Sequence, residues 1–144
     1  MSSYFRVRNF ITYHCPHPSN RARGGSAILI RDHIKHDNPT TIQEEEFQVT
    51  TVTVNCISRK VTVAAIYCPP RQRVTCDTFS ALFSQLGKCF VLGGDFNAKR
   101  VLWGSRLTTH KGRELFRAII SCQAEVATAR KPTYWPSDTS KRPN

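Results

Sequence analysis

Acidic residues are scarce in this 144-residue sequence, in which 10 Asp and Glu stand against 21 Lys and Arg. The net charge of +11 disfavours cationic partners. It favours a polyanion such as nucleic acid, because bound Lys and Arg release counterions from it. A basic surface without such a partner would account for the charge equally well.

Several patterns that would assign the chain to other classes are missing. None of the 6 cysteines forms a Cys-x-x-Cys pair, and His14-Cys-Pro-His17 has no second pair at zinc-ligand spacing. The first residues are basic, which argues against a secretory signal, and no apolar run is long enough to cross a membrane. We therefore expect an intracellular protein with no membrane partner, in which Cys68, Cys89 and Cys122, which lie in apolar runs, are reduced and buried.

Apolar periodicity predicts an α+β domain in which strands and helices are mixed. The expected strands are Ala27–Ile30, Phe47–Val54, Val61–Tyr67 and Cys89–Leu92, and the expected helices are Thr78–Leu86 and Lys111–Gln123. The short polar segment 55–60 predicts a hairpin between the second and third strands. Asp77 or Thr78 is expected to cap the first helix, and Gly87 to end it. Residues 1–23 carry no pattern that assigns them, and the tail from Lys131 onward resembles a loop.

The strongest chemical signal is the stretch Leu92-Gly-Gly-Asp-Phe-Asn-Ala98, where a buried strand leads into two glycines. If the strand continues, alternation places the side chains of Asp95 and Asn97 on the same side. The glycines would permit close approach of another backbone or of a phosphate. A turn in which Asp95 caps the backbone is an equally weighted alternative.

Five ordered blocks of this sequence resemble the endonuclease/exonuclease/phosphatase superfamily, in the branch carried by jockey- or R1-like non-LTR retrotransposons. They are Arg23-Gly-Gly-Ser-Ala-Ile-Leu-Ile30, Ala65-Ile-Tyr-Cys-Pro-Pro70, Gly94-Asp-Phe-Asn-Ala-Lys99 with Trp103-Gly-Ser-Arg106, Lys111-Gly-Arg-Glu-Leu115, and Pro132-Thr-Tyr-Trp-Pro136. The resemblance implies a DNase I-like four-layer α/β sandwich over residues 24–144, of which this chain would hold an incomplete part.

The resemblance also implies roles for individual residues. Asp95 resembles the residue that orients and deprotonates the attacking water, and Asn97 its partner at the scissile phosphate. Tyr67 resembles a phosphate-contacting tyrosine, and Thr133 a threonine that binds the DNA backbone. Four basic residues are further candidates for phosphate binding, with a solvated basic surface as the competing interpretation. These are Arg71, Arg73, Lys99 and Arg106.

The sequence departs from the family at its metal site. The Asn and Glu expected near the domain start and the terminal Asp-His pair have no counterpart, so no residue is assigned as a metal ligand. The resemblance implies a Mg²⁺-dependent DNA endonuclease in the nucleus, associated with a reverse transcriptase of the same element. The missing residues predict impaired activity. The alternative is a non-catalytic basic remnant that binds nucleic acid.

Overall fold

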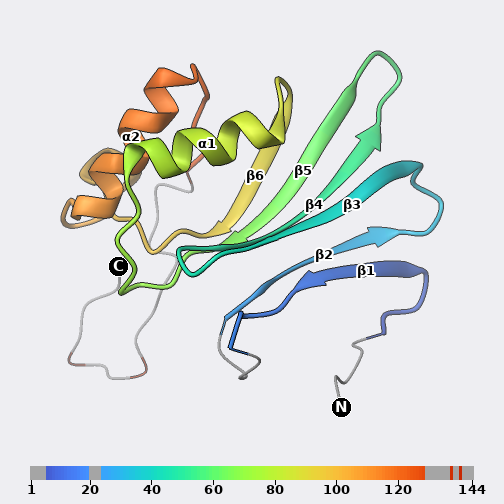
Figure 1. The fold of residues 1–144 in the computed structure, drawn as a ribbon, viewed down its shortest axis with the longest axis horizontal. Coiled ribbons are helices and arrows are strands. Elements are labelled where there is room, and N and C mark those ends of the chain that lie inside the picture. Colours follow the sequence, from blue (N-terminus) through green and yellow to red (C-terminus); the bar gives the residue numbers. More distant parts are fainter. Residues whose placement is uncertain (1–5, 20–23, 129–136, 138–139, 141–144) are drawn as a thin grey trace. The chain divides into compact units, whose positions relative to one another are not determined.

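The computed structural model describes residues 6–19, 24–128, 137 and 140. The elements of these residues are β1 (Phe10–Cys15), β2 (Ser26–Arg31), β3 (His36–Gln43), β4 (Gln48–Asn55), β5 (Lys60–Tyr67), α1 (Cys76–Leu86), β6 (Phe90–Asp95), the short helix η1 (Val101–Trp103) and α2 (His110–Ser121) (Figure 1). They form two compact units, the first made of Met1–Gln72 and Ser84–Phe96, the second of Arg73–Phe83 and Asn97–Asn144. Over the described ranges, no helix is long and apolar enough to span a bilayer.

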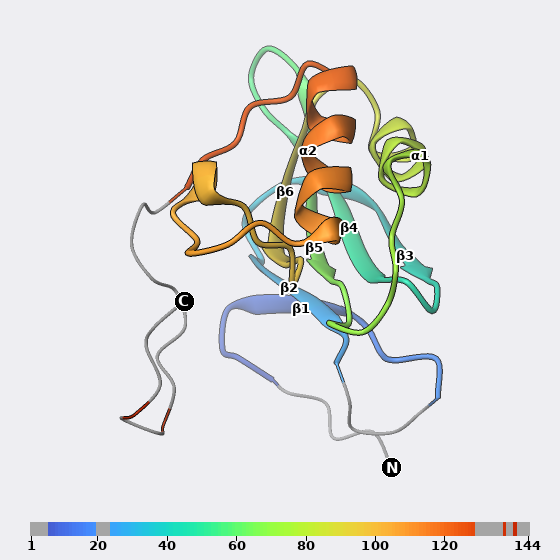
Figure 2. The same cartoon turned by 90° about the vertical axis from the view of Figure 1, so that its left-hand side faces the viewer.

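Two sheets pack face to face in the first unit (Figure 2). One is the antiparallel pair β1–β2, and the other has the strand order β3-β4-β5-β6. The expected hairpin is confirmed, because β4 and β5 pair antiparallel in an unbroken register. The last pair, β5 and β6, is parallel, and the chain between these strands contains α1. A parallel pair requires such a crossover connection.

Two strands of the first unit were not expected from the sequence. Residues 10–15, in the unassigned segment, form β1. The strand β3 is polar and contains Pro39, which normally argues against a strand. Here Pro39 falls within a register irregularity between Asp37 and Thr40, and β3 stands at the end of its sheet. Proline is tolerated at such edges and bulges because no ladder hydrogen bond is lost there.

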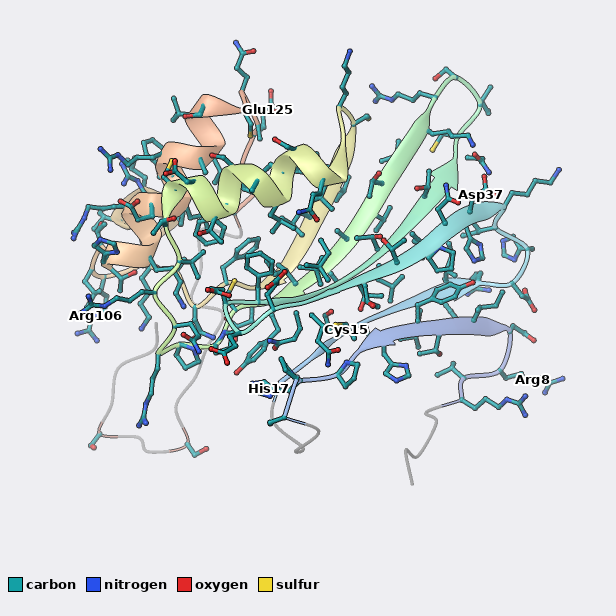
Figure 3. The ribbon with its side chains drawn as sticks, viewed as in Figure 1. Arg8, Cys15, His17, Asp37, Arg106 and Glu125 are labelled. Atoms are coloured by element: carbon teal, nitrogen blue, oxygen red, sulfur yellow. The ribbon has the colours of Figure 1, made fainter. Side chains whose placement is uncertain are left out.

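The polar interior between the two sheets is held by side-chain hydrogen bonds. The hydroxyl groups of Ser26 and Thr50 lie 2.9 Å apart, and the thiol of Cys15 donates to the carbonyl of Ile42 at 3.5 Å. Figure 3 places Cys15 between β1–β2 and the larger sheet. Burial raises the pKa of the Cys15 thiol. These bonds satisfy polar groups that would otherwise be costly to bury.

Both helices begin at threonine caps. The Thr75 hydroxyl accepts the backbone N–H of Thr78 at 3.2 Å, so α1 starts before the expected caps Asp77 and Thr78, and that expectation was wrong. Thr109 caps α2 by accepting the N–H of Gly112 at 3.1 Å. Gly87 ends α1 with a φ of 86°, as predicted.

The expectation that Cys68, Cys89 and Cys122 are buried is confirmed for Cys68 and was wrong for the other two. All 6 cysteines are free, and of these Cys15 and Cys68 are buried. Cys122 is exposed because α2 ends at Ser121, one residue before it, rather than at the expected Gln123. Cys89 is half-buried and precedes β6, whose own residues are all exposed or half-buried, so the expectation of a buried strand before the two glycines was wrong.

Gly94 lies where β5 and β6 approach each other most closely. Its φ is 144°, and a Cβ at this position would overlap the backbone carbonyl of Ile66 on β5. The expected close approach of another backbone is therefore confirmed. Gly93, by contrast, has open space where a Cβ would lie.

We predict that Gly94→Ala lowers the free energy of unfolding by roughly 2–5 kcal/mol, because it adds backbone strain and a clash with β5. The matched variant Gly93→Ala should change it by less than about 0.5 kcal/mol. Urea denaturation followed by circular dichroism measures both. Equal stability of the two variants would contradict the close approach.

Candidate active site

The aligned ends of β5 and β6 bring Tyr67 and Asp95 together. These two residues are direct partners in the parallel register, and the N–H of Cys68 donates to the Asp95 carbonyl at 2.8 Å to extend the pairing. Tyr67 and Asp95 therefore lie side by side at the same end of these two strands. Asp95 is exposed and Tyr67 is half-buried. A carboxylate that water can reach therefore stands beside a phenol held at its strand end.

Tyr67 pairs with Asp95 on one side and, on the other side, with Gln48 of the antiparallel strand β4. Laterally paired residues share one face of a sheet. Thr50, two residues beyond Gln48, bonds to Ser26 of β2, so this face is the one covered by β1–β2. The edge site is therefore built on the face between the two sheets of the first unit.

Gly24 supports the ring of Tyr67. It precedes β2, has a φ of 72°, and a Cβ there would overlap the Tyr67 ring. Only a residue without a side chain permits this approach at that φ. The ring thus rests on the backbone of the segment that leads into the opposing sheet.

The predicted alternation between Asp95 and Asn97 was wrong. The strand β6 ends at Asp95, and Asn97 has a φ of 45°, a left-handed conformation that strands do not contain. Asn tolerates this region better than most residues. Asn97 belongs to the second unit and Asp95 to the first, so the convergence of the two residues on one phosphate stays a prediction.

The candidate phosphate-binding residues are divided between the units. Arg71 is exposed in the first unit, just beyond the end of β5. Arg73, Arg106 (labelled in Figure 3) and Lys99 belong to the second unit, where the two arginines are exposed and Lys99 is half-buried. Thr133 lies outside the described residues. The roles of all five in phosphate binding stay predictions.

An aromatic cluster fixes the loop between β6 and α2. The Arg100 guanidinium lies 3.6 Å from the centre of the Phe116 ring, and the Trp103 ring meets Phe116 edge-to-face at 6.4 Å. Such contacts contribute packing and cation–π attraction. The Trp103 ring therefore packs on Phe116.

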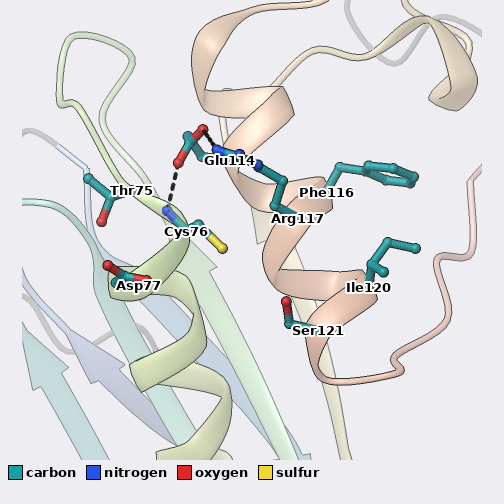
Figure 4. Close-up of a pocket in the computed structure, with 8 residues that line it drawn as sticks. All are labelled: Thr75, Cys76, Asp77, Glu114, Phe116, Arg117, Ile120 and Ser121. Carbon is teal, nitrogen blue, oxygen red and sulfur yellow. Dashed lines mark hydrogen bonds and ion pairs between the residues drawn. The ribbon is translucent and has the colours of Figure 1, made fainter.

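The carboxylate of Glu114, in a pocket of the second unit, has a structural role (Figure 4). The Glu114 side chain accepts the backbone N–H of Cys76 at 3.0 Å and holds Arg117 at 3.3 Å. The Cys76 bond, helped by Arg117, lowers the Glu114 pKa. A carboxylate held ionised in this way binds the start of α1 to α2 and is a poor proton donor. The pocket is lined by Thr75, Cys76, Asp77, Glu114, Phe116, Arg117, Ile120 and Ser121.

The donor groups at the β5–β6 edge do not amount to a protein-built metal site. Over the described residues, no three His, Cys, Asp or Glu side chains are placed to hold a metal ion. The Tyr67–Asp95 pair supplies one carboxylate, that of Asp95. Magnesium bound by one carboxylate would need its other ligands from waters and substrate phosphates. We therefore assign no chemical step to a metal.

Comparisons with known proteins agree with the fold and with the motifs. The model of the endonuclease-reverse transcriptase family matches residues 61–142. The chain belongs to this family. It is 36% identical over 126 residues to the RNA-directed DNA polymerase from mobile element jockey of Drosophila melanogaster, and 29% identical over 132 residues to the probable RNA-directed DNA polymerase from transposon X-element of the same organism. These alignments cover 88% and 91% of this chain, which spans only 14% of each relative.

A solved structure shares the fold. The endonuclease domain of TRAS1, a telomere-specific non-LTR retrotransposon, superposes with a TM-score of 0.74 at 14% sequence identity. The match covers 94% of this chain and 63% of the TRAS1 chain. The expected DNase I-like α+β fold is confirmed.

Two supporting residues of the site escaped the sequence analysis. Gly24 was identified only as part of a motif, although a Gly-Gly pair before a strand could have indicated a close contact. Gln48 stands in a β-branched run and is fully buried. A polar residue at the start of such a run was the available signal, but its partners come from β5 and from the turn before β4.

We predict that Gly24→Ala destabilises the chain more than Gly87→Ala does. Both glycines have positive φ, but only at Gly24 would a Cβ meet the Tyr67 ring. Gly87→Ala should lower the free energy of unfolding by about 1 kcal/mol. Gly24→Ala should cost roughly 1–3 kcal/mol more, because the ring must move.

Thermal and urea unfolding of both glycine variants in a Tyr67→Ala background test whether the Tyr67 ring causes the difference in stability. There the costs of the two glycine substitutions should become equal. A difference that persists without the ring would contradict the contact.

Proposed function

We propose that this chain is the endonuclease part of a retrotransposon protein and hydrolyses phosphodiester bonds of DNA. The observation that carries the proposal is the register pair Tyr67–Asp95 at the end of two parallel strands. Family membership supports it, as does the structural similarity to the TRAS1 endonuclease domain. The +11 charge suits a polyanionic substrate.

In the proposed reaction, Asp95 orients a water molecule and accepts its proton as the water oxygen attacks the phosphorus. A new P–O bond forms and one P–O ester bond breaks, and the leaving oxygen takes up a proton. Asp95 suits the role because its carboxylate is exposed to water beside a residue that can reach the phosphate.

Tyr67 is proposed to donate a hydrogen bond to a phosphate oxygen, on which negative charge grows during the attack. A donor held in advance stabilises that charge without reorganisation. The contact between Gly24 and the ring supplies such a hold. The Asn97 carboxamide is proposed to bind the same phosphate.

Magnesium dependence is proposed from family membership alone. Because relatives of this chain are RNA-directed DNA polymerases, we also propose that it acts with a reverse transcriptase, which would use the nick in nuclear DNA. The competing function is a basic module that binds nucleic acid without cleaving it, and the nicking assay described below separates the two.

DNA binding should be tolerant of sequence and steeply dependent on salt. Between 50 and 200 mM salt, the affinity for a short duplex should fall at least about tenfold, because each phosphate contact releases counterions. Arg71→Gln should weaken binding and reduce the salt slope. The matched variant Arg59→Gln, at the opposite end of β5, should not. Fluorescence anisotropy measures both, and an affinity unchanged by salt would refute the electrostatic basis.

Plasmid nicking by the 144-residue chain in magnesium should be weak. The Tyr67–Asp95 pair offers a magnesium ion a single carboxylate ligand, that of Asp95. Asp95→Ala should lower the residual rate at least about a hundredfold, the usual contribution of a general base. Asp32→Ala, an exposed carboxylate in the turn after β2, is the control and should leave it unchanged. Conversion of supercoiled plasmid to the relaxed circle gives the rate, and nicking that survives Asp95→Ala would remove the proposed base.

A further inference from the structure

Arg100, in the loop between β6 and α2, is a cation that the structure holds in place on an aromatic ring. Its guanidinium carbon lies over the Phe116 ring, 3.6 Å from the ring centre. An arginine in this position gains cation–π attraction and loses much of its rotational freedom. The side chain is therefore fixed by an aromatic face rather than by a carboxylate.

The backbone of Arg100 is fixed as well. Its carbonyl accepts the N–H of Trp103 at 3.0 Å and the N–H of Ser105 at 3.2 Å. The N–H of the next residue, Val101, donates to the Thr108 hydroxyl at 3.2 Å. Both ends of the residue are thus ordered before any ligand arrives, and a donor ordered in advance loses less entropy on binding.

The hydrogen-bonding edge of this guanidinium has no partner over the part of the chain that the structure describes. None of the ion pairs there includes Arg100, and only its Nε is both buried and unbonded. The residue as a whole is half-buried. The two Nη groups, which carry most of the donors of a guanidinium, are therefore left for a ligand from outside. The Nε is not such a donor, because the protein covers it.

The surrounding charge favours an anion as that ligand. Residues 97–113 contain no Asp or Glu, and Glu114, the next carboxylate along the chain, already accepts the Cys76 N–H and pairs with Arg117. A guanidinium presents parallel N–H donors that match two oxygens of a phosphate. The same residues contain these cations: Lys99, Arg100, Arg106, Lys111 and Arg113.

We propose that Arg100, held on the Phe116 ring, binds a backbone phosphate of the DNA substrate. The proposal rests on the proposed function for the identity of the anion. Phe116 is the positioning residue, because it holds the guanidinium without using its N–H donors. The contact carries no base preference, since every nucleotide offers the same phosphate.

Fluorescence anisotropy with a labelled short DNA duplex tests the contact without requiring cleavage. Arg100→Gln should weaken the affinity roughly tenfold, as expected for a lost hydrogen bond to a charged group. The slope of log affinity against log salt should become shallower by about 0.9. The control Arg117→Gln removes the same charge from an exposed arginine that is already paired with Glu114, and it should change the affinity less than about twofold. Equal losses in the two variants would overturn the proposal.

Phe116→Leu separates positioning from packing. It keeps an apolar side chain and the charge of Arg100, so the affinity should fall about threefold while the salt slope stays the same. In an Arg100→Gln background it should cause no further loss, because the ring acts through the guanidinium. An equal loss in both backgrounds would mean a general structural effect and would contradict the positioning role.

Nuclear magnetic resonance of the unsubstituted chain gives a readout that no substitution can disturb. The side-chain Nε–H resonance of Arg100 should move further when the short duplex is added than when poly-glutamate of equal charge is added. A resonance that the duplex leaves unmoved would overturn the proposal. One that poly-glutamate moves as far would also overturn it and would indicate an acidic protein partner. If the chain binds DNA through Arg100 but never nicks it, the proposed hydrolysis fails and the phosphate contact stands.

Discussion

The parallel pairing of β5 with β6 is the constraint on which the candidate site depends. It aligns Tyr67 with Asp95, and it is possible only because Gly94 lets the two backbones approach at the Ile66 carbonyl. A side chain at that point would push β6 away from β5. Gly94, next to the proposed catalytic base Asp95, therefore permits the strand pairing rather than contact with the substrate. The motif combines an architectural residue with a chemical one in adjacent positions.

The interior of the first unit is more polar than a purely structural core requires. Thr50 and Ser26 satisfy each other between the sheets, and Gln48 is anchored at only one of its two polar ends. Buried polar groups are costly unless they are paired. The unpaired acceptor lies in the same row as Tyr67 and Asp95, at the edge where we place the reaction.

The second unit depends on a different set of contacts. Thr109 caps α2 and also bonds to the backbone of Lys99, whose N–H it accepts at 3.1 Å. A Cβ on Gly112 would overlap the Lys99 carbonyl, so the close docking of this loop on the helix needs a glycine there. Lys99 and Gly112 were both visible in the sequence motifs, but their contact was not. The spacing of residues in a motif can thus reflect loop docking as well as chemistry.

Local chemistry in the sequence determined much of this protein: the hairpin of β4 and β5, the cap at Thr109, the end of α1 at Gly87, and the placement of Asp95 at the end of a strand. These features depend on alternation, capping and backbone preference, which act over a few residues. The edge strand β3, the end of β6 before Asn97, the ring contact at Gly24 and the unpaired acceptor of Gln48 were decided by the tertiary structure. Each depends on a partner strand, turn or backbone segment, or on where strand pairing ends, and local propensity carries no information about such partners.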